Sequence, residues 1–191
     1  MNIRNSSRKF SDEFRSLLEM TLKDISRRQE RKKILKSVNC RVWYWGIRRT
    51  EKLNYLTIYF KCLDSKGSGQ KHLVRIILDS YPNYLEKYKD LKPEEIVKRA
   101  LNEGEIRIHC VCSDFLFGGY AYIADKKKYG IVKEPRAPHI RNPREEGAFC
   151  KHCSATLSRA NLFIKSIMID LNKGNFKKSV RIKTGDKVYV I

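Results

Sequence analysis

The chain has 191 residues, of which 41% are hydrophobic, 10% aromatic and 32% charged. This composition is typical of one folded domain with a small attached module, and it excludes a disordered tail. The formal net charge of +20 predicts an anionic partner, nucleic acid before a membrane surface. The longest apolar run, residues 115–124, is about half of the roughly 20 residues that a membrane-spanning helix needs.

Residues 11–36 are predicted to form a helix whose N-cap is Ser11 and whose apolar stripe stops at Ile25. A run of cations follows, comprising Arg27, Arg28, Arg31, Lys32, Lys33 and Lys36. We interpret this run as a solvated helix end or as an arm that contacts phosphates. The N-terminal residues include no apolar segment of signal-peptide length, so we expect the protein to stay in the cytoplasm.

Three segments rich in β-branched and aromatic residues, 40–47, 54–64 and 71–79, predict a small antiparallel meander. In the second segment, apolar residues from Leu56 to Cys62 alternate with polar ones, which is typical of a half-buried strand. The segments also carry the aromatic residues Trp43, Tyr44, Trp45 and Tyr55 and the cations Arg41, Arg48 and Arg49. We interpret the aromatic residues as core residues, with stacking on nucleic-acid bases as the alternative.

Pro82 interrupts the pattern, and residues 81–89 receive no assignment. A short helix is predicted from Pro93 to Ala100, followed by a strand at 106–111. From Ala155, apolar residues on more than one side predict a largely buried helix that ends at Gly174 and either fills the core or serves in part as a partner interface. The last residues predict a basic strand or hairpin that turns at 185–186 and could add to a partner's sheet.

These elements predict an α+β fold in which helices pack on a small antiparallel sheet. We expect four segments along the chain. Residues 1–39 form a basic helix, and residues 40–104 form the strands and a short helix. Residues 105–174 form a metal-binding module with an inserted loop, and residues 175–191 form a basic strand or tail.

Two tight pairs of potential metal ligands lie at the predicted strand end and helix start: Cys110-Val111-Cys112 and Cys150-Lys151-His152. Cysteines in the cytoplasm are reduced, which favours a metal site over disulfides. Three thiolates and an imidazole suit one tetrahedral structural zinc ion, with Cys110, Cys112, Cys150 and His152 as its ligands.

Other cysteine and histidine residues lie close to these pairs. A four-cysteine site, in which Cys153 replaces His152, is the alternative. Otherwise Cys153 is expected to be a small buried apolar residue, as are Cys40 and Cys62 on the strands. Strand alternation predicts that His109 points away from the site.

The pattern C-x-C, a spacer, then C-x-H at the head of a helix resembles the SWIM zinc finger over residues 105–169. In this chain 37 residues separate Cys112 from Cys150, which is longer than is usual for that finger and requires an inserted loop or helix.

A narrower likeness involves the C-x-C-x-D-F segment, the aromatic residues that follow it, a proline-rich turn and a closing C-K-H. These features comprise Cys110 to Phe115, then Phe117, Tyr120, Tyr122, Pro135, Pro138, Arg141-Asn142-Pro143 and Gly147 to His152. They resemble small proteins of large tailed bacteriophages. The resemblance implies a phage origin and a role in the virion, assembled in the host cytoplasm, with other phage structural proteins as partners.

No phosphate-binding loop, H-E-x-x-H or G-x-S-x-G motif is present, so we expect no enzyme and no small-molecule substrate. The first functional hypothesis is a zinc-stabilised structural component of a phage particle. The second is a regulator or accessory protein that binds DNA or RNA. The candidate contacts for nucleic acid or partners are Arg27, Arg28, Arg31, Lys32, Lys33, Lys126, Lys127, Lys128, Arg141 and Arg144.

Overall fold

The computed structural model describes residues 39–49, 55–63, 69–145 and 147–177, and the backbone of 181–184 and 187–190. The predicted helix at 11–36, with Arg27, Arg28, Arg31, Lys32 and Lys33, lies outside the described residues. So do residues 64–68 and the predicted turn at 185–186. Within the described ranges, no helix combines the length and the apolar character needed to cross a membrane.

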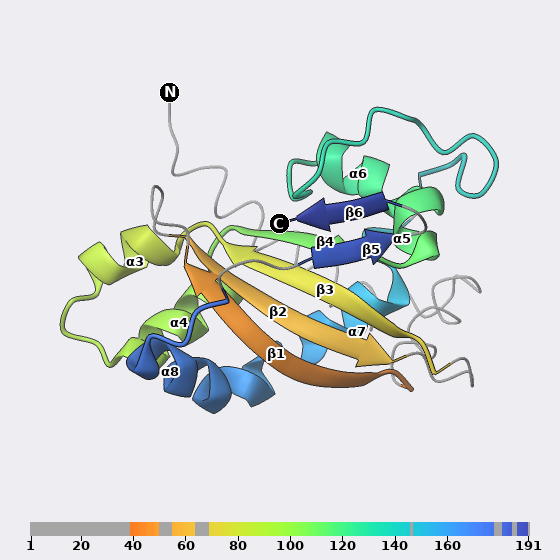
Figure 1. The fold of residues 1–191 in the computed structure, drawn as a ribbon. Helices are drawn as coiled ribbons and strands as arrows, with labels where there is room; N and C mark the ends of the chain where they lie inside the picture. The colour runs from red at the N-terminus through yellow and green to blue at the C-terminus, as the bar shows by residue number, and fades with distance from the viewer. Residues whose placement is uncertain are drawn as a thin grey trace, which may run out of the picture.

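A four-stranded antiparallel sheet forms the centre of the fold, so the α+β prediction is confirmed (Figure 1). Its strands lie side by side in chain order: β1 (Arg41–Arg49), β2 (Leu56–Leu63), β3 (Lys71–Leu78) and β4 (Ile106–Cys110). The β-branched and aromatic residues of these segments favour a pleated surface on which they pack against their neighbours. A separate two-stranded hairpin, β5 (Arg181–Thr184) and β6 (Lys187–Val190), confirms the predicted C-terminal hairpin.

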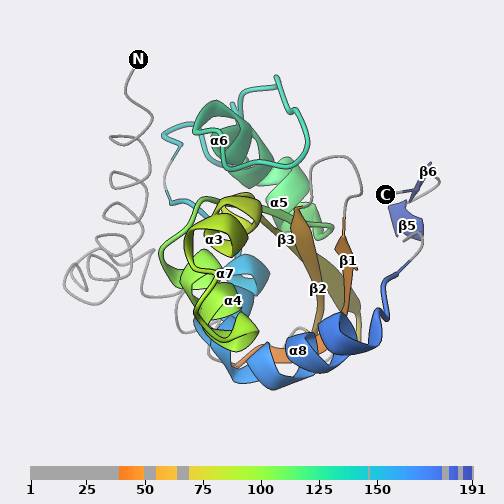
Figure 2. The same cartoon turned by 90° about the vertical axis from the view of Figure 1, so that its left-hand side faces the viewer.

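Helices cover one face of the sheet (Figure 2). α3 (Tyr81–Lys87) and α4 (Pro93–Asn102) connect β3 to β4, and α5 (Ser113–Phe117) and α6 (Tyr120–Lys126) follow β4. α7 (Lys151–Arg159) lies across all four strands of the sheet. After the 3₁₀ turn η1 (Ala160–Phe163), α8 (Ile164–Lys173) packs against β1 and α4. We call this side of the sheet the helix face and the opposite side the second face.

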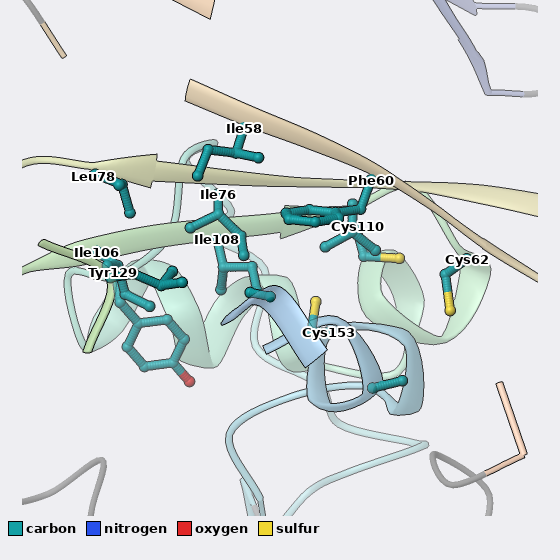
Figure 3. Close-up of a cluster of buried hydrophobic side chains, with 14 of the residues drawn as sticks. Ile58, Phe60, Cys62, Ile76, Leu78, Ile106, Ile108, Cys110, Tyr129 and Cys153 are labelled. Atoms are coloured by element: carbon teal, nitrogen blue, oxygen red, sulfur yellow. The ribbon is translucent and has the colours of Figure 1, made fainter. Parts of the chain in front are cut away.

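The helix face of the sheet forms the main core of the protein (Figure 3). Strand register aligns Ile58, Ile76 and Ile108 in one row and Phe60, Val74 and Cys110 in the next, and all six side chains are buried. Burying each aliphatic side chain contributes about 1.5–3 kcal/mol. The same register that builds the core therefore also carries Cys110 to its place under α7.

The segment from Ala155 to Gly174 differs from its prediction as one largely buried helix. The 3₁₀ turn divides it, and α8 buries Ile164 and Ile167 while Leu162 and Ile169 are 77% and 53% exposed. Among the described residues, α8 packs mainly against β1, α4 and η1, so the prediction of extensive burial is wrong for the side that carries Ile169, and the alternative of a partner interface on that side stays a prediction. The predicted end is confirmed, because Gly174 adopts the left-handed conformation that glycine tolerates best.

Candidate metal centre

The first ligand pair lies where β4 passes into α5. Cys110 is the last residue of β4, and Cys112 is the N-cap of α5. The backbone N–H of Val111 still donates to the carbonyl of Leu73, 3.2 Å away, so the strand keeps its course up to this residue. The chain then curls, and the N–H of Phe115 donates to Cys112 Sγ at 3.2 Å. This curl turns both sulfur atoms towards α7.

The second pair opens α7. Cys150 is the N-cap, with an extended backbone, and His152 lies in the first helical turn. Ser154 N–H donates to the carbonyl of Cys150 at 3.1 Å, which closes that turn. Cys112 and Cys150 both sit at helix N-termini, where free N–H groups and the helix dipole favour a negative thiolate.

The structure brings the two pairs together. One ligand atom from each of Cys110, Cys112, Cys150 and His152 lies within 4.8 Å of all the others, and we call this set the cysteine–histidine cluster. Cys110 Sγ is 3.9 Å from His152 Nδ1. In a tetrahedral site with metal–sulfur bonds of about 2.3 Å, neighbouring ligand atoms are about 3.8 Å apart. The cluster therefore has the size of a tetrahedral metal site.

The cluster is closed to solvent, since its four residues are between 0% and 3% exposed. Burial raises the pKa of the Cys110 thiol well above its ordinary value. Burial also opposes ionisation of Cys150, but hydrogen bonds from Cys110, Cys112 and Cys153 lower its pKa well below its ordinary value. A divalent cation bound by the cluster would offset the desolvation of several thiolates at once.

The surroundings of the cluster add groups that sequence patterns do not reveal. The ring of His72, on β3, packs against that of His152, with ring centroids 4.3 Å apart and the two planes tilted by 36°. His152 Nε2 is buried without a hydrogen-bond partner among the described residues. His72 comes to this end of the sheet because the register between β2 and β3 pairs it with Cys62. No local sequence motif predicts that His72 lies near the cluster.

The remaining cysteines also lie near this end of the core. Cys153 is fully buried, and its sulfur points from α7 towards the sheet, where Cys110 and Cys62 are found (Figure 3). Cys40 and Cys62 are buried, as expected for core residues. His109 does point away from the cluster, because it pairs with Arg75 on the second face and contacts the Phe115 ring. Burial, followed by the charge of Arg75, lowers the pKa of His109 to about 4.

The basic residues predicted as partner contacts fall into two groups along the sequence, and the structure describes only the second group, between Lys126 and Arg144. Lys126 ends α6 and forms an ion pair with Glu145 at 2.7 Å. The loop that follows exposes the side chains of Lys127, Lys128, Arg141 and Arg144. We call residues 126–144 the basic loop. It belongs to the long insertion between the two ligand pairs, which contains α5, α6 and an irregular segment.

Comparisons with protein-family models, curated proteins and solved structures find no match for this chain. Function must therefore be argued from the cluster and the surfaces themselves.

Proposed function

We propose that the cysteine–histidine cluster binds one structural zinc ion and that the protein is a non-enzymatic binding or assembly component. The observation that carries the proposal is the convergence of four buried ligand atoms within 4.8 Å of one another. Three thiolates with one imidazole are a common ligand set of structural zinc sites. A catalytic zinc site would keep an open position for water, whereas the four candidate ligands of this cluster would complete a tetrahedron.

The ion would join the end of β4 to the start of α7 across the 37-residue insertion. Closing such a long loop is unfavourable in the unfolded chain, and metal binding compensates for that entropy. The ion thereby holds the helix that covers the core against the sheet. The SWIM-like ligand pattern agrees with this role and stays a prediction.

Elemental analysis of the purified full-length protein tests the metal. We expect one zinc ion per chain, and Co²⁺ substitution should give the visible bands of a tetrahedral site with sulfur–metal charge transfer. Protein that folds and melts identically with and without a strong chelator, and that carries no metal, contradicts the proposal. If the Cys153→Ala variant binds one zinc ion per chain and the His152→Ala variant binds none, the fourth ligand is the imidazole of His152.

The phage-like sequence features support a more specific proposal, in which the protein is a virion component that docks on neighbouring structural subunits. Leu162 and Ile169, 77% and 53% exposed on the outer side of η1 and α8, supply apolar anchors for such docking. Mass spectrometry of purified particles tests this role. Detection at a reproducible copy number supports it, and absence from complete particles contradicts it.

A second candidate is an accessory protein that binds DNA or RNA, and the exposed cations of the basic loop favour it. Binding through several phosphates falls steeply with salt, with a log–log slope of about −0.9 per contact on duplex DNA. If a Lys127→Glu, Arg141→Glu double variant binds nucleic acid with a flatter salt dependence than the wild type, the result would support the basic loop as the site of phosphate contact. No retention of DNA or RNA at low salt would remove this candidate.

A further inference from the structure

The second face of the sheet has a charge pattern unlike that of the helix face. Strand register and packing place one set of side chains on this face: Arg41, Trp43, Trp45, Arg48, Thr57, Tyr59, Lys61, Leu63, Lys71, Leu73, Arg75, Ile77, Arg107 and His109. The four strands contain no aspartate or glutamate. A row of cations without strand carboxylates produces a positive potential that an anionic partner would neutralise.

Both tryptophans of the chain belong to this face. Trp43 is 41% exposed, unlike the neighbouring Tyr44, which packs against the core on the helix face. Trp45 packs edge-on against Tyr59, with ring centroids 6.2 Å apart. The interpretation of these aromatics as core residues therefore holds for Tyr44, whereas Trp43 keeps much of its ring in contact with solvent.

Lysines lie beside both indole rings. Lys61 Nζ is 4.4 Å from the centroid of Trp45, and Lys71 Nζ is 6.0 Å from that of Trp43. Lys177 enters from the segment after α8, its N–H donating to the carbonyl of Ile47 at 2.8 Å and its Nζ lying 5.4 Å from the Trp45 ring. Aromatic rings and lysine ammonium groups thus lie within about 4–6 Å of one another on this face.

The bulge in β1 makes room for this arrangement. The register with β2 shifts between Tyr44 and Gly46, and Gly46 has a φ of +148°. A β-carbon at Gly46 would lie 2.6 Å from Cε of Lys177, so glycine permits the lysine chain to cross the strand. Regular alternation from Trp43 already places Trp45 on the second face, beside Tyr59. The extra residue shifts the positions after it, so that Ile47 lies opposite Ile58 on the helix face and Arg48 lies opposite Thr57 on the second face.

Arg75 is buried beneath the second face and adds to the positive potential at that surface. It is 6% exposed, and its Nε has no hydrogen-bond partner among the described residues. Burial lowers its pKa, the hydroxyl of Tyr59 opposes that shift, and the charges of Arg107 and Arg48 add to it. A guanidinium held between cations favours an anion on the adjacent surface.

We propose that the second face binds single-stranded nucleic acid, with Trp43 stacking on a base and Arg41, Lys61 and Lys71 contacting phosphates. Each base of a single strand can stack its flat face on an aromatic ring, and each base has a backbone phosphate close to it. An aromatic surface bordered by cations therefore suits an unpaired strand. A duplex hides its base faces and would use the cations alone. This inference goes beyond the proposed zinc role and requires only that the zinc-bound chain is the folded chain.

The test uses zinc-loaded full-length protein and an oligothymidylate of about 15 nucleotides, within the range that such stacking platforms cover. Because both tryptophans lie on this face, quenching of intrinsic fluorescence reports directly on its occupation. We expect saturable quenching. Trp43→Ala should weaken binding about tenfold, and Trp43→Phe should restore most of the affinity. A Lys61→Glu, Lys71→Glu double variant should bind weakly and show a flatter salt dependence, by about 0.7 per lost contact.

Control variants separate this face from the rest of the molecule. Lys89→Glu changes an exposed lysine in the α3–α4 connection, at the opposite end of the sheet, and should leave binding unchanged. The Lys127→Glu, Arg141→Glu variant should also retain quenching. Equal affinity for a duplex of the same length, insensitivity to Trp43→Ala, or loss of binding only in the loop variant would each overturn the proposal.

Failure of this inference is distinguishable from failure of the zinc proposal. Zinc content and thermal unfolding are measured for every variant. A wild-type protein without metal contradicts the zinc site, whereas zinc-loaded, cooperatively melting protein that fails to bind or quench contradicts only the assignment of the second face.

Discussion

The two faces of the four-stranded sheet are built from alternate residues of the same strands, yet their chemistry differs completely. On the helix face, Phe60, Ile76 and Cys110 are wholly buried and lead into the cysteine–histidine cluster. On the second face, Trp43 and Lys71 meet solvent. The period of two along a strand thus separates the buried core from the face that we propose for binding. Substitutions of buried residues on the helix face should affect folding, and those of the exposed Trp43 and Lys71 on the second face should affect binding.

The largest expected effect comes from Cys150→Ser. Structural zinc contributes an apparent binding free energy of about 10–16 kcal/mol in small zinc domains. That is as large as the total stability of an ordinary domain, about 5–15 kcal/mol. We therefore expect an unfolded or aggregated product without bound zinc, measured by circular dichroism and elemental analysis. The matched control is Cys153→Ala, which should keep its metal. A Cys150→Ser protein with wild-type melting would show that the cluster does not stabilise the fold.

The second prediction compares one aromatic residue from each face. Phe60 is fully buried and contacts the ring of Phe163, with centroids 5.7 Å apart, so Phe60→Ala should cost about 3–5 kcal/mol through lost burial and a cavity. Trp43→Ala, at an exposed position, should cost less than about 1 kcal/mol. Urea unfolding of zinc-loaded protein measures both. Equal losses would mean that the second face is as much a part of the core as the helix face.

Local patterns were sufficient to predict the sheet and the ligand pairs. Alternation from Leu56 to Cys62 predicts a strand whichever strand it pairs with, and the C-x-C and C-K-H pairs identify candidate ligands without tertiary information. The pairs converge because one ends β4 and the other begins α7, which crosses that strand.

Features that depend on tertiary packing could not be predicted in the same way. The sequence predicts that Pro82 interrupts regular structure, yet Pro82 lies in the first turn of α3, where its missing N–H costs no helical hydrogen bond. The alternation in β2 predicts that Thr57 and Tyr59 face solvent, but they are only 5% and 1% exposed. For Tyr59 the cause is packing by residues from neighbouring elements, such as Trp45 and Val111. No pattern within β2 contains that information.

A smaller effect is expected at the edge of the second face. Asp79 accepts hydrogen bonds from Nε and Nη2 of Arg107, both at 2.7 Å, and so fastens the end of β3 to β4. Asp79→Ala removes this two-point pair from a half-buried site and should cost about 1–3 kcal/mol. Glu94→Ala, which breaks the exposed pair with Lys98, should cost less than about 0.5 kcal/mol. Similar values from urea unfolding for both variants would contradict a structural role for the Arg107 pair.

The smallest effect concerns a polar contact on the helix face. The hydroxyl of Tyr44 donates to Asp170 Oδ2 at 2.5 Å and joins β1 to α8, so Tyr44→Phe should cost about 1 kcal/mol. Burial, then the hydrogen bond and charge of Asp170, raise the pKa of Tyr44 above its ordinary value of 10.0. The unfolded chain ionises first as the pH rises, so the contribution of Tyr44 is complete below pH 10 and is lost above it. The stability difference between wild type and Tyr44→Phe should therefore shrink in urea titrations from pH 8 to about 11. A difference that stays constant over this range would mean that the phenol ionises equally in both states, and the contact with α8 would then contribute nothing to the fold.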